Sequence, residues 1–385
     1  MTVEALIAGV SLTVWLYLLL GRGGFWLTRE RDDANLPLST EAAWPAVIAV
    51  VPARNEADVV ARAVTSLVRQ DYPGPFRIIL VDDQSSDGTS DIAEAAAREA
   101  GAPERLQIIQ GRPRPDGWTG KLWAVEQGIA RALSDGDAPT YFLLTDADIG
   151  HASDNLRRLV TRAQSGGFSL VSLMVKLHCE TWCERALIPA FVFFFQMLFP
   201  FAWVNRPDNS TAAAAGGCML VQRQALEAAG GIASIGREII DDCALGRHMK
   251  MQGPIRLTLT DHAVSLRPYE NFGEIRRMVA RTAYTQLRYS PVLLLGTILA
   301  MAVVFLAPPA LTLFGAGGAQ LAGIASWIAM AIALQPMLRF YRLSPLWGFA
   351  FPAIAATYVA FTIDSAIQHW RGQGGMWKGR AQAIR

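Results

Sequence analysis

Long apolar segments at the two ends of the chain constrain its fold more than any other feature. The segment from Val3 to Leu20 is almost free of charge and is close to the roughly 20 residues that a spanning helix needs. Three further apolar segments lie near the C-terminus, at Pro291 to Phe314, Ala319 to Leu338 and Leu346 to Ile367. The sequence therefore predicts one N-terminal and about three C-terminal transmembrane helices, with an anchor over residues 1–22 and the last helices over 291–370.

The overall composition agrees with a membrane-associated chain. Only 18% of the residues are charged, against about 25% in an ordinary soluble domain. The formal net charge of +2 provides no bulk field for phosphate polymers, so we expect no nucleic-acid partner. Four cysteines are too few for a disulfide scaffold in a chain of this length.

Basic residues after the first apolar segment predict its orientation. Arg22, Arg29 and Arg31 follow directly, and the positive-inside rule places that flank in the cytoplasm. A cleaved signal peptide is the alternative, but no basic residue precedes the apolar stretch. We expect a multi-pass protein of a bacterial-type inner (cell) membrane, with the domain that follows the first segment in the cytoplasm. Four crossings would place the basic tail, residues 371–385, outside the cell, so in the alternative topology one segment lies in the interface.

A fifth apolar run, Ala186 to Val204, is interrupted by Pro189 and Pro200. A full crossing would place the motifs on its two sides in different compartments. We expect an interfacial or re-entrant segment, with a buried core helix as the alternative.

The middle of the chain, residues 44–268, alternates short β-branched runs with helical patterns. This order predicts an α/β domain with a parallel sheet and crossover helices. The expected strands are Val47–Val51, Arg77–Val81, Leu106–Ile109, Tyr141–Leu144 and Leu170–Val175. The expected helices are Glu56–Arg69, Ser90–Glu99, Lys121–Leu133 and Asp154–Gln164.

Acidic residues follow several of these strands, and ligands of such sheets bind at the carboxyl ends of strands. Asp82 and Asp83 end the second strand and can accept hydrogen bonds from a nucleotide base or ribose; a turn that only caps the next helix is the alternative. Asp146 and Asp148 end the fourth strand, and alternation points them to the same side. Together they can hold a hard divalent cation against a diphosphate.

Six motifs in this order resemble the family 2 glycosyltransferases of the GT-A (Rossmann-like) fold. They are VPARNEAD at 51–58, VDDQSSDGT at 81–89, GWTGKLWAVEQG at 117–128, TDAD at 145–148, GGCMLVQRQALEAAGGI at 216–232 and IDDCALGRHMKMQG at 240–253. The layout with C-terminal spans is similar to the ceramide-glucosyltransferase-like branch and to the glycosyltransferases associated with hopanoid biosynthesis.

The resemblance implies roles for individual residues. Asp242 would be the catalytic base, with Asp241 beside it where the family usually has Glu. Asp146 and Asp148 would hold Mg²⁺ or Mn²⁺. The donor would be bound by Pro52, Ala53, Glu56, Asp82, Asp83, Lys121, Asp146 and Arg281. Arg281 is all that remains of the family's Gln/Arg-x-x-Arg-Trp motif, and the missing Trp argues against a processive enzyme.

The segment 269–290 carries apolar residues at helical spacing among several arginines. Such a basic amphipathic helix suits the membrane surface; packing onto the catalytic domain is the alternative. We therefore expect an inverting transfer of a sugar from a nucleotide-diphosphate donor, expected to be a UDP-sugar, to a membrane lipid such as a hopanoid or sphingolipid-like alcohol. The alternatives are a processive polysaccharide synthase and a non-enzymatic nucleotide-sugar-binding membrane protein.

Overall fold

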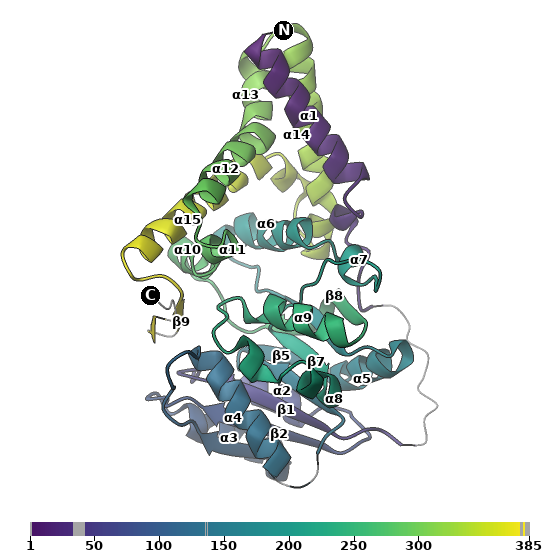
Figure 1. Ribbon diagram of the computed structural model, residues 1–385, viewed down its shortest axis with the longest axis vertical. Coiled ribbons are helices and arrows are strands. Elements are labelled where there is room, and N and C mark those ends of the chain that lie inside the picture. The colour runs from purple at the N-terminus through teal and green to yellow at the C-terminus, as the bar shows by residue number, and fades with distance from the viewer. Residues whose placement is uncertain (1, 34–42, 135, 137, 378–379, 382–385) are drawn as a thin grey trace.

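The computed structural model describes residues 2–33, 43–134, 136, 138–377 and 380–381. Figure 1 shows an α/β domain beneath a tapering group of helices, whose apex is formed by α1 (Val3–Leu20), α13 (Ala307–Phe314) and α14 (Gly317–Phe340). Lys378 and Arg385 of the expected basic tail lie outside the described residues.

The α/β domain is built on one eight-stranded sheet with the order β3-β2-β1-β4-β7-β6-β8-β5. Its strands are β1 (Val47–Ala53), β2 (Phe76–Asp82), β3 (Leu106–Gln110), β4 (Tyr141–Thr145), β5 (Ile149–His151), β6 (Leu170–Lys176), β7 (Cys218–Gln222) and β8 (Ile255–Ser265). The α/β fold class is confirmed, and five of these strands, β1, β2, β3, β4 and β6, are those expected from the sequence.

The expectation of a parallel sheet is wrong for two of its eight strands, β5 and β7, because β6 and β8 are parallel to each other and run in the same direction as β4. Strands β1, β2, β3 and β4 are parallel neighbours, whereas β7 runs antiparallel to both β4 and β6. β5 is likewise antiparallel to β8. The chain leaves the sheet after β6 to form the helices beneath the apex and re-enters through β7, so no single crossover helix joins these two strands.

Alternation along β1 places its side chains in two separate cores. Ile48 and Val50 belong to one apolar cluster, and Val47, Ala49 and Val51 belong to the other. This two-sided burial explains the continuous apolar run in the sequence. Helices α2 (Val60–Val68), α3 (Thr89–Glu99) and α5 (Asn155–Gly166) contribute to the second cluster, and α4 (Gly120–Ser134) and α9 (Asp241–Gln252) to the first.

Four helical segments are long and apolar enough to cross a membrane: Val3–Leu20, Trp182–Val204, Pro291–Phe314 and Gly317–Phe340. The last expected span falls on α15 (Phe351–Trp370), which is not among these four within the described residues. This helix carries Asp364, whose Oδ1 pairs with Arg276 Nη1 of α10 (Phe272–Ala280) at 3.0 Å. α15 is thus tied by charge to the helix layer next to the α/β domain.

Helix α6 (Trp182–Leu198) and the short α7 (Phe201–Val204) cover the run around Pro189 and Pro200. In Figure 1, α6 lies across the molecule, between the α/β domain and the apex. More than half of its residues are buried, and the Leu187 carbonyl accepts a 2.8 Å hydrogen bond from the Tyr358 hydroxyl of α15. Together α6, α10 and α11 (Ala283–Gln286) form a layer, here called the platform, that separates the sheet from the apolar helices.

Close packing of α4 on the sheet generates a stability prediction. A Cβ atom on Gly128 would lie 2.4 Å from Val50 Cγ1 and 3.1 Å from Val81 Cγ2. Gly128→Ala should therefore destabilise the protein by about 1–3 kcal/mol through overpacking. Thermal unfolding of the full-length protein in detergent should show a lower midpoint.

Gly9→Ala is the matched control, because a Cβ on this helical glycine of α1 meets no atom within 4 Å. A Gly128→Ala midpoint equal to that of Gly9→Ala would contradict the packing account.

Candidate active site

Three parallel strands, β1, β2 and β4, bring their carboxyl ends to the same edge of the sheet. Asp82 and Asp83 are both buried there. The Asp83 backbone N–H donates to the Ala53 carbonyl at 2.8 Å, which ties the ends of β1 and β2 together. Arg54 Nη1 lies 3.6 Å from Asp83 Oδ2. Asp82 accepts hydrogen bonds from Ser85 N–H, at 2.8 Å, and from the Ser90 hydroxyl, so its carboxylate shapes the turn that leads into α3.

Lys121, near the start of α4, joins two carboxylates from distant parts of the chain. Its Nζ lies 2.7 Å from Asp146 Oδ1 and 3.5 Å from Asp241 Oδ2. Burial disfavours the charged ammonium, but the charges of Asp146 and Asp241 outweigh this effect and raise the pKa of Lys121. The lysine therefore remains charged at neutral pH.

Asp146 follows β4 directly. Burial raises the pKa of its carboxyl above the ordinary value, and the charges of Asp148 and Asp241 act in the same direction, while Lys121 opposes them. The site thus holds more negative charge than its lysine neutralises.

Asp242 begins α9 next to Asp241 and faces the same cluster. Its Oδ2 accepts a 3.0 Å hydrogen bond from the Gly216 N–H, and its Oδ1 accepts one from the Cys243 N–H at 2.7 Å. Burial, followed by the charge of Asp241, raises the pKa of Asp242 to about 6. A carboxylate with this pKa is ionised at neutral pH and is a better proton acceptor than an ordinary aspartate.

Arg267 completes the cluster, and sequence reasoning missed it. It follows β8, and its Nε lies 3.0 Å from Asp148 Oδ2 while its guanidinium also pairs with the Glu56 carboxylate. The only sign of Arg267 in the sequence is its position directly before Pro268, where the similarity to family 2 glycosyltransferases ends.

Arg281, in contrast, is not brought to the cluster. It caps the C-terminus of α10 and is exposed. Among the described side chains it has no ion pair with any of the site carboxylates. Its expected role as a donor ligand is not supported by this arrangement.

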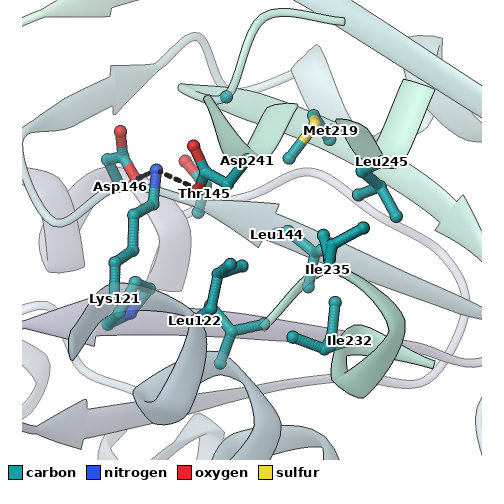
Figure 2. A pocket seen from close by; sticks show the side chains of 13 residues that line it. Lys121, Leu122, Leu144, Thr145, Asp146, Met219, Ile232, Ile235, Asp241 and Leu245 are labelled. Carbon is teal, nitrogen blue, oxygen red and sulfur yellow. Dashed lines mark ion pairs between the residues drawn. The ribbon is translucent and has the colours of Figure 1, made fainter. Parts of the chain in front are cut away.

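A pocket lies between these groups and the first apolar cluster. Figure 2 shows Lys121, Asp146, Thr145 and Asp241 at one end of it and apolar side chains at the other. The remaining lining residues are Pro52, Leu122, Val125, Leu144, Gly216, Met219, Ile232, Ile235 and Leu245. Pro52 is therefore placed at the pocket, whereas Ala53, the last residue of the same strand β1, is buried.

Comparison with known proteins agrees with this geometry. Residues 48–230 match the model of glycosyl transferase family 2. This segment is a family 2 glycosyltransferase domain.

Curated relatives match part of this chain. The β-monoglucosyldiacylglycerol synthase of Trichormus variabilis is 32% identical over 117 residues, which are 30% of this chain and 23% of that protein. An N-acetylglucosaminyltransferase of Azorhizobium caulinodans is 30% identical over 159 residues, 40% of this chain and 37% of that protein. The chain thus spans well under half the length of these relatives.

A solved structure resembles nearly the whole fold. The mannosyltransferase PcManGT from Pyrobaculum calidifontis, in complex with GDP-Man and Mn²⁺, superimposes with a TM-score of 0.57 at 20% identity. The match covers 96% of this chain and 100% of that chain. It supports the GT-A fold, including the helices outside the α/β domain.

The carboxylates of the site suit a hard divalent cation. Asp146 and Asp148 offer carboxylate oxygens, the ligands that Mg²⁺ and Mn²⁺ prefer. No group of three or more His, Cys, Asp or Glu side chains arranged for a metal occurs among the described residues. Two carboxylates, with substrate phosphates and water as further ligands, would therefore hold the ion, and the excess negative charge of the cluster favours it.

The raised pKa of Asp242 predicts how its charge affects stability. An aspartate in the unfolded chain titrates near pH 3.9, so between about pH 4 and pH 6 the folded protein binds more protons at this site than the unfolded one. The contribution of the Asp242 carboxyl to the free energy of unfolding is therefore present at low pH and is lost as the pH rises towards about 6. Asp242→Asn should make the unfolding midpoint less sensitive to pH over that window.

The measurement is thermal unfolding of both proteins between about pH 4 and pH 7. Parallel pH profiles for the two proteins would show that Asp242 has an ordinary pKa.

Proposed function

We propose that this protein is an inverting glycosyltransferase that moves a sugar from a nucleotide diphosphate, expected to be UDP, to a hydroxyl group of a membrane lipid. One observation carries the proposal. Asp242, a half-buried carboxylate with a raised pKa, faces the same cluster as the Lys121–Asp146 pair. Its helix α9 lies beneath the platform helix α6 in Figure 1, so a base and a leaving-group site lie on the side of the molecule that faces the platform.

The donor would lie along the carboxyl edge of the sheet. Asp83, next to Pro52 and Ala53, would receive the base, while Asp82 supports the turn beside it. Asp146 and Asp148 would hold the divalent cation, which when bound stabilises negative charge on the departing diphosphate. Lys121 holds Asp146 and Asp241 in place through its two ion pairs.

Asp242 would act on the acceptor. Its carboxylate takes the proton from the acceptor hydroxyl while the oxygen attacks the anomeric carbon and the bond to the diphosphate breaks. Backbone N–H groups of Gly216 and Cys243 fix its orientation. A single displacement assisted by one base inverts the configuration at the anomeric carbon.

A lipid acceptor is favoured by the platform. Trp182, at the start of α6, is 74% exposed, and Phe272, at the start of α10, is 48% exposed. Such aromatic side chains at the level between a polar domain and apolar helices are typical of a membrane interface. One curated relative is named as a glycolipid synthase, which agrees with this class of acceptor; hopanoids and sphingolipid-like alcohols are the finer candidates.

The proposed placement in the membrane rests on the charges that follow α1 and on the location of nucleotide sugars in the cell. The basic residues after α1 and the cytoplasmic supply of nucleotide sugars favour a multi-pass protein of the inner membrane, with the α/β domain in the cytoplasm. The platform would then lie at the inner leaflet.

Asp242→Asn tests the assignment of the base. The variant should lower the transfer rate by about 10²–10⁴-fold, the usual contribution of such a group, and should leave UDP binding nearly intact because Asp242 acts on the acceptor. Rates from single-turnover assays and UDP affinity from calorimetry provide the two readouts. A variant that keeps more than about a tenth of the rate would contradict this role.

Transfer assays test the acceptor class. Full-length protein should transfer label from a radiolabelled UDP-sugar to a single chloroform-soluble product when supplied with Mn²⁺ and total lipid extract, because the platform delivers the acceptor from the bilayer. Asp242→Asn is the control. Label found in a water-soluble polymer would identify a polysaccharide synthase instead, and release of free sugar alone would contradict lipid transfer.

A further inference from the structure

Arg267 holds two carboxylates at the edge of the acid cluster, and the transfer chemistry above does not explain why. Its side chain is 34% exposed, while those of Glu56 and Asp148 are 10% and 22% exposed. The Nε–Asp148 contact of 3.0 Å and the pairing of Nη2 with Glu56 engage two nitrogens of one guanidinium. This forked geometry is specific to arginine among the cationic side chains.

The backbone that carries Arg267 is fixed from several sides. The Leu266 N–H donates to the Asp148 carbonyl at 2.8 Å, and Arg62 Nη2 donates to the Leu266 carbonyl at 3.0 Å. Two residues after Arg267, the Tyr269 N–H donates to Glu184 Oε1 of α6 at 2.7 Å. The guanidinium is therefore presented to Asp148 by a rigid segment, not by a freely moving surface arginine.

Asp148 thus has two competing cationic partners. It is one of the two carboxylates assigned to the divalent cation, yet one of its oxygens already accepts an N–H from Arg267. Two cations within a few ångströms of one carboxylate repel each other strongly at the effective dielectric of a protein site. Binding of the metal must overcome or displace the arginine.

We propose that Arg267 is a positioning residue that acts as the resident counter-ion of Asp148 and opposes binding of the free metal. The inference rests on the metal site of the proposed function. In the absence of substrate, Arg267 keeps Asp148 and Glu56 paired and in place. A metal that arrives with a nucleotide diphosphate brings compensating negative charge and ligands of its own, so the arginine favours entry of metal and donor together.

The test is the affinity of the full-length protein in detergent for Mn²⁺ alone, measured from the EPR signal of free Mn²⁺. Arg267→Gln should bind Mn²⁺ about tenfold more tightly than the wild type, as expected for loss of one competing charge a few ångströms away. A merely structural role for Arg267 would weaken binding instead. Thermal unfolding shows whether each variant is folded.

Two control variants test whether the change in Mn²⁺ affinity arises from the contact between Arg267 and Asp148. Arg62→Gln removes an exposed arginine that contacts the same segment but no carboxylate of the cluster, and should leave the Mn²⁺ affinity unchanged. In an Asp148→Asn background, Arg267→Gln should produce no gain, because the carboxylate for which the two cations compete is gone.

Each outcome decides the question. Equal or weaker Mn²⁺ binding by Arg267→Gln would overturn the proposed role of Arg267, and so would the same gain in the Asp148→Asn background. Either result would leave the metal site of the proposed function standing. Absence of Mn²⁺ binding in both wild type and Arg267→Gln overturns the metal site and the inference with it. If Arg267→Gln does not fold, Arg267→Met, which also removes the charge beside Asp148, should tighten Mn²⁺ binding by the same factor of about ten; an unchanged affinity would overturn the proposal.

Discussion

An excess of carboxylates over cations at the carboxyl edge of the sheet is the constraint on which the rest of this structure depends. Lys121 pairs with Asp146 and Asp241, and Arg267 pairs with Asp148 and Glu56. Burying charges costs free energy unless they are paired, so both cations are needed to hold the cluster together. They do not neutralise it, since these two cations face four carboxylates and Asp242 adds a fifth. The remaining negative charge suits a site that receives its compensating charge with a metal-bound ligand.

A short stretch of backbone and several hydrogen bonds connect this acid cluster to the platform. Pro268 separates Arg267 from Tyr269, and Tyr269 is held by Glu184 and by the Thr181 hydroxyl, which donates to its carbonyl at 3.3 Å. Glu184 is fully buried and also accepts hydrogen bonds from the Thr181 and Glu180 N–H groups at the start of α6. The start of the platform helix α6 and the edge of the acid cluster are therefore joined by hydrogen bonds. In the proposed function, an acceptor at the platform would thereby take a defined position relative to Asp242.

The sequence predicted the parts of the site that are local. An apolar strand ending in acids is visible at β2 and β4, and the parallel strands β1, β2 and β4 bring those ends together as expected. Strands β7 and β8 and the pairing of Arg267 with Glu56, 211 residues apart, depend on the path that the chain takes through the platform, which no local pattern encodes. Arg281 was expected at the donor site from a motif of which it keeps only one residue, and the C-terminal cap of α10 leaves it exposed instead.

Binding of UDP with and without a divalent cation tests the central claim most directly. Calorimetry on the full-length protein should detect UDP binding in Mn²⁺ and little or none in EDTA, because the surplus carboxylates repel a bare diphosphate. Asp146→Asn with Asp148→Asn should remove the dependence on the metal. Equal UDP affinity in Mn²⁺ and in EDTA would contradict the account, since it would show that the charge of the cluster is balanced without a cation.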